Sequence, residues 1–176
     1  MEARAGCEGR VLFDALAPDL VVLDLNVLVS GLMAERTRAT TPPAMCLAAA
    51  RAGTLRLCLS PGTLARLRRV LSYPKLGFSE QAVDAISHEI VEWVPREAWV
   101  PDPAGPPGAP EHGRLCPDPE DEAVLRVALS AGAAFLVTGD AHLLQQLTPE
   151  GARLVRKTSL AILTARELLD HLPRGP

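Results

Sequence analysis

The most informative part of the sequence reads Val21-Val-Leu-Asp-Leu-Asn-Val-Leu-Val29. It belongs to a continuous apolar run, Leu20–Leu25, whose branched residues are typical of a strand buried on both faces of a parallel sheet. Asp24 lies inside this run, where a carboxylate is costly unless another group pairs with it. The stretch therefore predicts a central strand that carries a functional acid.

Outward from this strand, apolar runs alternate with helical patterns. Further strands are predicted at Leu55–Leu59 and Ala134–Val137, with a fourth candidate at Ala152–Val155. Helices are predicted at Pro42–Ala52 and in segments that begin at Ser60, Ser79, Asp118, His142 and Thr164. Strands that alternate with helices favour parallel pairing, so we predict an α/β fold, a three-layer α/β/α sandwich with a central, mostly parallel sheet.

The length of the chain bounds its organisation. It has 176 residues, which is enough for one domain with a sizeable core. We expect residues 1–18 to form an N-terminal extension and residues 19–176 to form a single domain. Residues 95–117 are expected to be a loop, because the proline- and glycine-rich stretch Pro101–Pro110 cannot form a regular element.

The composition excludes several classes of protein. The formal net charge is -3 and aromatic residues make up 3% of the chain, which argues against a basic nucleic-acid-binding tail and against a surface built on base stacking. No apolar run reaches the roughly 20 residues of a spanning helix, so no membrane partner is expected. The cysteines form no Cys-x-x-Cys pair, which indicates free thiols in a reducing cytoplasm.

Three aspartates are expected to converge at one edge of the sheet. Asp24 is in the first strand, Asp140 follows the strand at 134–137, and Asp121 begins the helix that leads into that strand. Parallel strands open their carboxyl ends on the same edge, and an antiparallel crossover helix starts there. Protonation, or a hard divalent cation such as Mg²⁺ or Mn²⁺, would relieve the repulsion among these carboxylates. A metal site of this kind suits phosphodiester hydrolysis.

Each acid also has a structural explanation. Asp118 stands before a proline as a typical helix cap, and Asp121 would gain from the helix dipole. Asp140 could be a simple N-cap. Asn26 could be a turn residue or could hold the Asp24 loop by hydrogen bonds. Asp24 is the residue that is hardest to explain without a functional role.

Several segments carry a resemblance when they are taken in order. They are Val22–Ser30, Ser60–Lys75, Asp118–Leu125 and Ala131–Leu144. Their order and spacing resemble those of PIN-domain proteins, in particular the VapC-like toxin component of type II toxin–antitoxin systems. The resemblance implies an α/β/α fold, a cytoplasmic Mg²⁺- or Mn²⁺-dependent ribonuclease site, an RNA substrate and an antitoxin protein as partner. It also implies a homodimer, for which the apolar faces of residues 64–71 and 83–90 could supply the interface.

The resemblance also implies roles for individual residues. Asp24, Asp121 and Asp140 would be the catalytic and metal-binding acids. Thr138 would support Asp140, and Asn26 would support Asp24.

Two positions depart from the family's pattern. The family usually has Asp-Thr-Asn where this chain has Asp24-Leu25-Asn26, and its second acid, a glutamate, aligns with Arg66. A cation at that place weakens divalent metal binding. Glu35 or Asp118 could replace the missing acid. The alternative function is therefore a catalytically impaired PIN module that binds RNA or a protein partner without cleaving.

Basic residues are expected near the same rim. Arg66, Arg69 and Lys75 lie on the polar side and at the exit of one predicted helix, and could contact RNA phosphates. Arg36 and Arg38 are expected in the loop after the first strand. A solvated helix face explains the same pattern without RNA. A phosphoacceptor with Asp24 as nucleophile is disfavoured, because an asparagine takes the place of the nearest second aspartate.

Overall fold

The computed structural model describes residues 19–102, 113–140 and 143–172. Its sheet contains strands in the order β2-β1-β3-β4, and every neighbouring pair is parallel. The strands are β1 (Leu20–Leu23), β2 (Arg56–Cys58), β3 (Phe135–Val137) and β4 (Ala161–Leu163). The predicted three-layer α/β/α fold with a parallel sheet is confirmed.

The first strand lies in the interior of the sheet, as its apolar sequence predicts. Val21 pairs with Leu57 of β2 on one side and with Phe135 of β3 on the other. Val21, Val22 and Leu23 are each at most 2% exposed. The strand ends at Leu23, two residues earlier than predicted, because Asp24 already caps the following helix.

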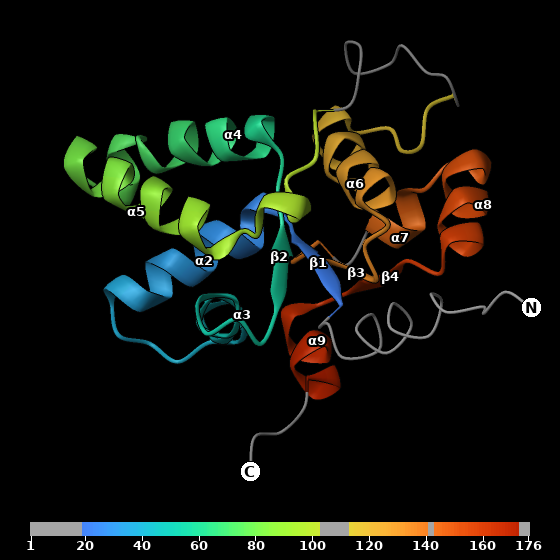
Figure 1. Cartoon of the computed structure of the whole chain (residues 1–176). Helices are drawn as coiled ribbons and strands as arrows, with labels where there is room; N and C mark the ends of the chain where they lie inside the picture. The colour runs from blue at the N-terminus through green and yellow to red at the C-terminus, as the bar shows by residue number, and fades with distance from the viewer. Residues whose placement is uncertain (1–18, 103–112, 141–142, 173–176) are drawn as a thin grey trace, which may run out of the picture.

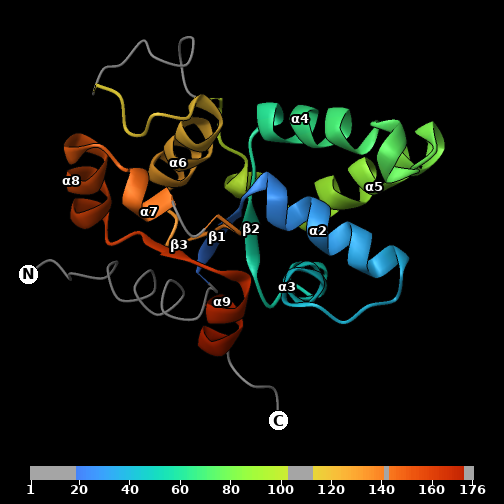
Figure 2. The ribbon, with the colours of Figure 1, turned by 180° about the vertical axis from the view of Figure 1, so that it is seen from behind.

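Helices surround the sheet, and most of them begin where the sequence predicts. They are α2 (Leu25–Arg36), α3 (Pro42–Arg51), α4 (Pro61–Leu71), α5 (Glu80–Trp93), α6 (Pro119–Ala131), α7 (Leu143–Gln146), α8 (Pro149–Thr158) and α9 (Ala165–His171), with short 3-10 turns η1 (Pro74–Leu76) and η2 (Arg96–Ala98). Figures 1 and 2 show α2, α3, α4 and α5 on one side of the strands and α6, α7 and α8 on the other. The carboxyl ends of the strands therefore open between two groups of helices.

Local capping explains several helix starts. The side chain of Ser60 accepts a hydrogen bond from the Thr63 amide at the start of α4, and Ser79 caps α5 in the same way. Thr164 and Glu167 form the predicted capping box of α9. Gly132 ends α6 in the left-handed conformation, at a φ of 61°.

Two predictions about the elements are wrong. Residues 25–36 form α2 rather than the end of a strand and a loop, so Arg36 is the last residue of a helix. The apolar residues of this segment fit both the two-residue repeat of a strand and the 3.6-residue repeat of a helix, so its packing against the core decides that it forms a helix. Residues 152–155 lie in α8, which Thr148 and Pro149 initiate, and the fourth strand is β4 instead. The apolar faces expected to supply a dimer interface are mostly buried within one copy of the chain, since Leu71 of α4 and Ile90 of α5 are fully buried and the two helices contact each other.

The segment predicted as a loop, residues 95–117, begins in contact with the sheet. The amide of Val100 donates to the Leu59 carbonyl, and the Leu59 amide donates to Ala98. The carboxylate of Asp102 accepts from the Gly62 amide at the start of α4. Residues 103–112 and the predicted extension 1–18 lie outside the described residues.

The cysteines of the described residues are free thiols in the interior of the protein. They are Cys46, Cys58 and Cys116, and burial raises the pKa of each, to about 11, 11 and 12 respectively. Cys7 lies outside the described residues.

In the part of the chain that the structure describes, no helix has both the length and the apolar character to cross a membrane.

Candidate active site

Asp24 sits where β1 turns into α2, and the structure holds its carboxylate firmly. The Asp24 amide donates to the Val137 carbonyl at 2.8 Å, which ties this turn to the end of β3. One carboxylate oxygen accepts from the Leu25 amide at 2.6 Å, and the other accepts from the Thr138 hydroxyl at 2.8 Å. The residue is 9% exposed. The groups that pair with this buried carboxylate are therefore neutral hydrogen-bond donors, the Leu25 amide and the Thr138 hydroxyl.

The pKa of Asp24 is raised above its ordinary value. Burial is the largest cause, and the negative charge of Asp140 adds to it. The hydrogen bonds from Thr138 and Leu25 and the positive charge of Arg66 act in the opposite direction. A site that raises the pKa of a buried acid in this way favours a cation or a proton beside it.

Thr138 joins the turn after β1 to the turn after β3. Its hydroxyl donates to Asp24 and accepts from the Asp140 amide at 3.0 Å and from the Asn26 side-chain amide at 3.4 Å. The Asn26 carbonyl oxygen accepts from the Gly139 amide at 2.9 Å. The side chain of Asn26 thus reaches Asp24 through Thr138 and also holds the turn after β3.

Asp121 comes to the same edge from α6. It is the third residue of this helix and is half-buried. Burial is the largest cause that raises its pKa, followed by the charges of Asp118, Asp24 and Asp140. The three predicted acids are therefore close enough to act on one another, although they come from three separate segments.

Asp118 serves as the cap that the sequence suggests. Its carboxylate accepts from the Glu120 amide at 2.7 Å and from the Asp121 amide at 3.4 Å. This contact orients the first turn of α6 and with it the backbone of Asp121. The structure therefore shows a positioning contact for Asp118.

A family model described as PIN domain matches residues 20–142, a span that runs from β1 past β3 and contains all of the acids described above. The chain belongs to the PIN-domain family. No curated protein and no solved structure matches the chain. The PIN domain is a nuclease fold whose members commonly bind RNA and generally use divalent metal ions.

One cation lies near these acids. Arg66 on α4 forms an ion pair with Glu120 on α6, at 2.8 Å between Nη2 and Oε2. Its charge also acts on Asp24, whose pKa it lowers. Both interactions are consistent with the expected position of Arg66 at the edge of the sheet where the acids lie. The ion pair with Glu120 was not predicted, because the two residues are 54 positions apart (120 − 66) and no local pattern links them.

Other predicted residues lie farther from the acids. Glu35 pairs with Arg51 near the end of α2, about 16 Å along the helix from Asp24. It therefore cannot replace the missing second acid. Arg69 and Lys75 are exposed, and the Lys75 ammonium lies over the ring of Tyr73.

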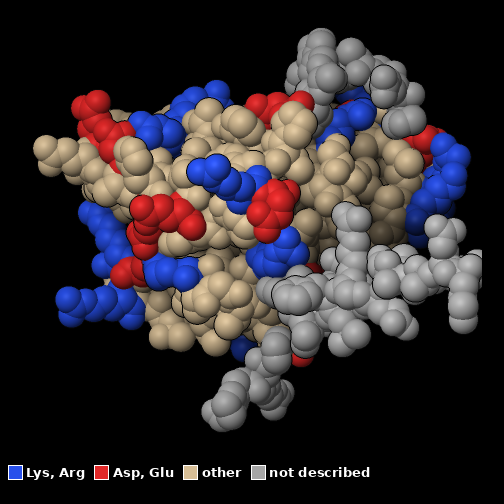
Figure 3. Space-filling view, in the orientation of Figure 1, with Lys and Arg blue, Asp and Glu red and all other residues tan. Residues whose placement is uncertain are grey.

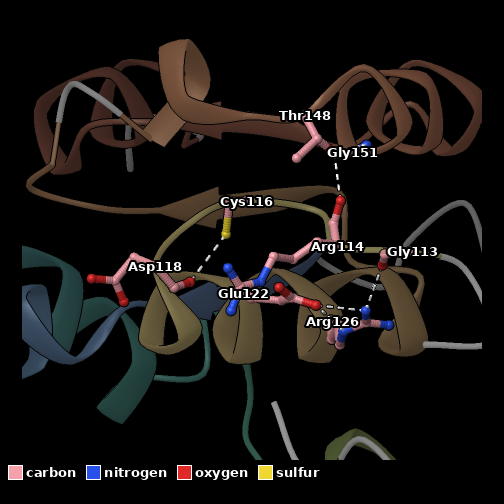
Figure 4. Close-up of polar contacts among 8 residues, drawn as sticks. All are labelled: Gly113, Arg114, Cys116, Asp118, Glu122, Arg126, Thr148 and Gly151. Carbon is pink, nitrogen blue, oxygen red and sulfur yellow. Dashed lines mark hydrogen bonds and ion pairs between the residues drawn. The ribbon is translucent and has the colours of Figure 1, made fainter. Parts of the chain in front are cut away.

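The start of α6 is anchored by a buried ion pair that sequence reasoning missed (Figure 4). Glu122 is 1% exposed and accepts from Arg126 at 2.6 Å, and Arg126 also donates to the Gly113 carbonyl at 3.0 Å. The Thr148 hydroxyl donates to the Arg114 carbonyl at 2.6 Å. The segment before α6 is therefore held between α6 and α8. The i,i+4 spacing of Glu122 and Arg126 was the available signal.

The donor chemistry of the site fits a hard divalent cation. Asp24, Asp121 and Asp140 offer carboxylate oxygens, which Mg²⁺ and Mn²⁺ prefer. Burial, and after it the charges of neighbouring acids, raises the pKa of Asp24 and of Asp121, and a bound cation would offset both effects. As they stand, no three His, Cys, Asp or Glu side chains within residues 19–102, 113–140 and 143–172 are placed to hold a metal ion. Metal binding would therefore require these side chains to move together.

Proposed function

We propose that this PIN-domain protein is a metal-dependent endoribonuclease that hydrolyses phosphodiester bonds in RNA. The observation that carries the proposal is the placement of three acids at one edge of the sheet: Asp24 follows β1, Asp140 follows β3, and Asp121 lies in the first turn of α6. These residues would hold Mg²⁺ or Mn²⁺. When bound, such an ion makes water a better nucleophile and offsets negative charge on the phosphate.

The protein's own residues prepare the site for this reaction. Thr138 holds Asp24 as a hydrogen-bond acceptor, and its hydroxyl also accepts from the backbone of Asp140. Asn26 braces the same turn through Gly139. Asp118 accepts a hydrogen bond from the Asp121 amide and so positions Asp121.

Basic side chains would guide the RNA backbone. Figure 3 shows basic and acidic side chains interspersed on the face that it presents, so a broad basic platform does not supply the attraction there. Arg66 is the best placed of the predicted phosphate contacts, because it is the one whose charge acts on Asp24. Arg69 and Lys75 are exposed on the same helix and at its exit, where they could extend the path.

The biological setting follows from the resemblance to VapC-like toxins. We propose a cytoplasmic toxin that an antitoxin protein holds inactive, and a homodimer as its assembly. Tyr73, which follows α4, and Val91 on α5 are each 42% exposed and offer apolar surface to a second copy. Light scattering should give the mass of a dimer, and a monomer at high concentration would contradict this part of the proposal.

The nuclease proposal is tested with purified protein, single-stranded RNA and Mn²⁺. We expect cleavage that EDTA abolishes, and heat of Mn²⁺ binding in calorimetry. Asp24→Asn should lose both. Asp170→Asn is the matched control, because Asp170 is exposed near the far end of α9 and should leave both unchanged. Wild-type protein that neither binds Mn²⁺ nor cleaves RNA would overturn the proposal.

The ion pair between Arg66 and Glu120 favours a second candidate function. In that case the guanidinium takes the place of a metal ion, and the protein is a PIN module that binds RNA or a protein partner without cleaving. Wild-type protein would then be inactive with Mn²⁺, and Arg66→Glu would restore cleavage. Cleavage by the wild-type protein excludes this candidate.

A further inference from the structure

A cavity opens beside the candidate active site, on the side of Asp140. Its volume is about 420 Å³, and it lies among the starts of α2, α3 and α9 and the turn after β3. Among its lining residues are Asn26, Val27, Ser30, Pro43, Asp140 and Ala165. The cavity is therefore continuous with the acidic edge but is built mainly from helices on one side of the sheet.

We infer that this cavity is a subsite for one nucleobase of the RNA, next to the phosphate at which the chain is cut. The inference rests on the proposed function, because it places the reacting phosphate at Asp24, Asp121 and Asp140. Thr138 and Asp140 line the cavity and also belong to the candidate active site. A nucleotide whose phosphate lies at the acids can reach the cavity with its own base.

The volume of the cavity suits a single nucleoside. Binding sites for small molecules usually enclose about 300–1,000 Å³. The cavity is near the lower end of that range, which is enough for one base with part of its ribose.

The lining favours a neutral ring over a phosphate. Val27, Pro43 and Ala165 contribute apolar surface, and no lysine or arginine is among the described residues that line the cavity. The carboxylate of Asp140 at its edge repels an anion. A base is uncharged, so it needs no lysine or arginine and is not repelled by Asp140, and its flat apolar faces can contact the apolar lining.

Two polar side chains can read the edge of the base. Asn26 is exposed, and its amide has a second N–H and a second carbonyl lone pair beyond the bonds to Thr138 and Gly139. The hydroxyl of Ser30 lies one helical turn further along α2 and is also exposed. An asparagine amide can pair with a base edge as donor and acceptor at once. Recognition would therefore combine apolar contact with hydrogen bonds, which is consistent with the low aromatic content.

The first test measures binding without metal or cleavage. We would titrate EDTA-treated wild-type protein with each of the four ribonucleosides, which carry no phosphate for Asp140 to repel, and follow backbone amide signals by NMR. We expect millimolar binding that shifts the signals of Val27, Ser30 and Ala165. Absence of shifts at these residues with all four nucleosides would overturn the inference.

The second test uses cleavage and a variant that fills the cavity. Ser30→Phe places a ring where the base would lie, and Ser130→Phe is the matched control on an exposed serine near the end of α6. We expect Ser30→Phe to reduce cleavage about tenfold, as for the loss of one base contact, and to bind Mn²⁺ like the wild type. A single abasic nucleotide at the position that meets the cavity should reduce cleavage by the wild type but not by Ser30→Phe.

The outcomes separate this inference from the proposed function. If RNA is cleaved equally by the wild type and Ser30→Phe, the nuclease proposal stands and the nucleobase subsite is wrong. If the wild type cleaves no RNA but the nucleosides shift Val27, Ser30 and Ala165, the cavity binds bases and the nuclease proposal fails. Thermal unfolding of both serine variants shows that a loss of cleavage does not come from a loss of folding.

Discussion

The hydroxyl of Thr138 donates a 2.8 Å hydrogen bond to the buried carboxylate of Asp24. Because the same oxygen accepts from the Asp140 amide and the Asn26 side chain, its one hydrogen is committed to Asp24. This contact joins the ends of β1 and β3, together with the bond from the Asp24 amide to the Val137 carbonyl, and keeps an Asp24 oxygen as an acceptor. The two turns that carry Asp24 and Asp140 are thereby held in one arrangement.

Replacing Thr138 should disturb this arrangement. Thr138→Val keeps the shape of the side chain but leaves a buried Asp24 oxygen without its donor. We expect a loss of about 1–3 kcal/mol in the free energy of unfolding, measured by urea denaturation. Thr138→Ser retains the hydroxyl and is the control, which should lose clearly less. Equal stability of the valine variant and the wild type would show that this bond does not matter.

Arg66 should weaken metal binding in the wild-type protein. Arg66→Glu replaces a cation that acts on Asp24 with an acid, so the affinity for Mn²⁺ should rise about tenfold, which corresponds to about 1.4 kcal/mol. Calorimetry with Mn²⁺ measures the change. Arg69→Glu makes the same charge change at an exposed position of α4 and should alter the affinity much less. An equal effect of both variants would mean that Arg66 acts only through the net charge.

Asp121 should make the stability of the metal-free protein depend on pH. Its pKa is raised in the folded protein, first by burial and then by nearby acids, so the folded state holds its proton to a higher pH than the unfolded state does. The stability of the metal-free protein should therefore fall as the pH rises from about 4 through the raised pKa. Asp121→Asn should remove this loss and raise the melting temperature by a few degrees at pH 7.

The comparison of pH values provides the control for Asp121→Asn. The gain in melting temperature should shrink as the pH approaches the ordinary pKa of an aspartate, where the wild-type side chain is also neutral. Asp170→Asn should give no gain at either pH. A gain that is equal at pH 4 and pH 7 would point to packing and not to charge.

The ion pair between Glu122 and Arg126 on α6 should contribute more to the free energy of unfolding than an ion pair on the surface. Arg126→Leu leaves the carboxylate of Glu122 buried without its partner, so we expect a loss of about 3–5 kcal/mol in the free energy of unfolding. Arg153→Leu breaks the exposed pair with Glu150 and should change stability little. Denaturation in urea compares the two variants. Similar losses would show that burial of Glu122 is not what gives the pair its effect.

Most of the sheet and the helix starts could be predicted because they depend on neighbouring residues. The apolar run before Asp24 produces β1, and Ser60, Ser79 and Thr164 accept hydrogen bonds from amides a few positions away. Parallel strands share one carboxyl edge, so the order of elements alone brought Asp24, Asp121 and Asp140 to that edge in the prediction. Helix α2 was missed because a short apolar run fits both a strand and a buried helix until its packing is known.

The local sequence thus contained the fold class, the capping contacts and the three acids, since each follows from nearby residues or from the order of elements. Folding in three dimensions alone brought Arg66 to Glu120, Thr138 to Asp24, and Pro43 to Ala165 around one cavity. These partners lie between 54 and 122 positions apart in the chain (120 − 66 and 165 − 43). The physical reason is that charge and hydrogen bonds act over a few ångströms of space, and no short pattern in the chain records which distant residues will share that space.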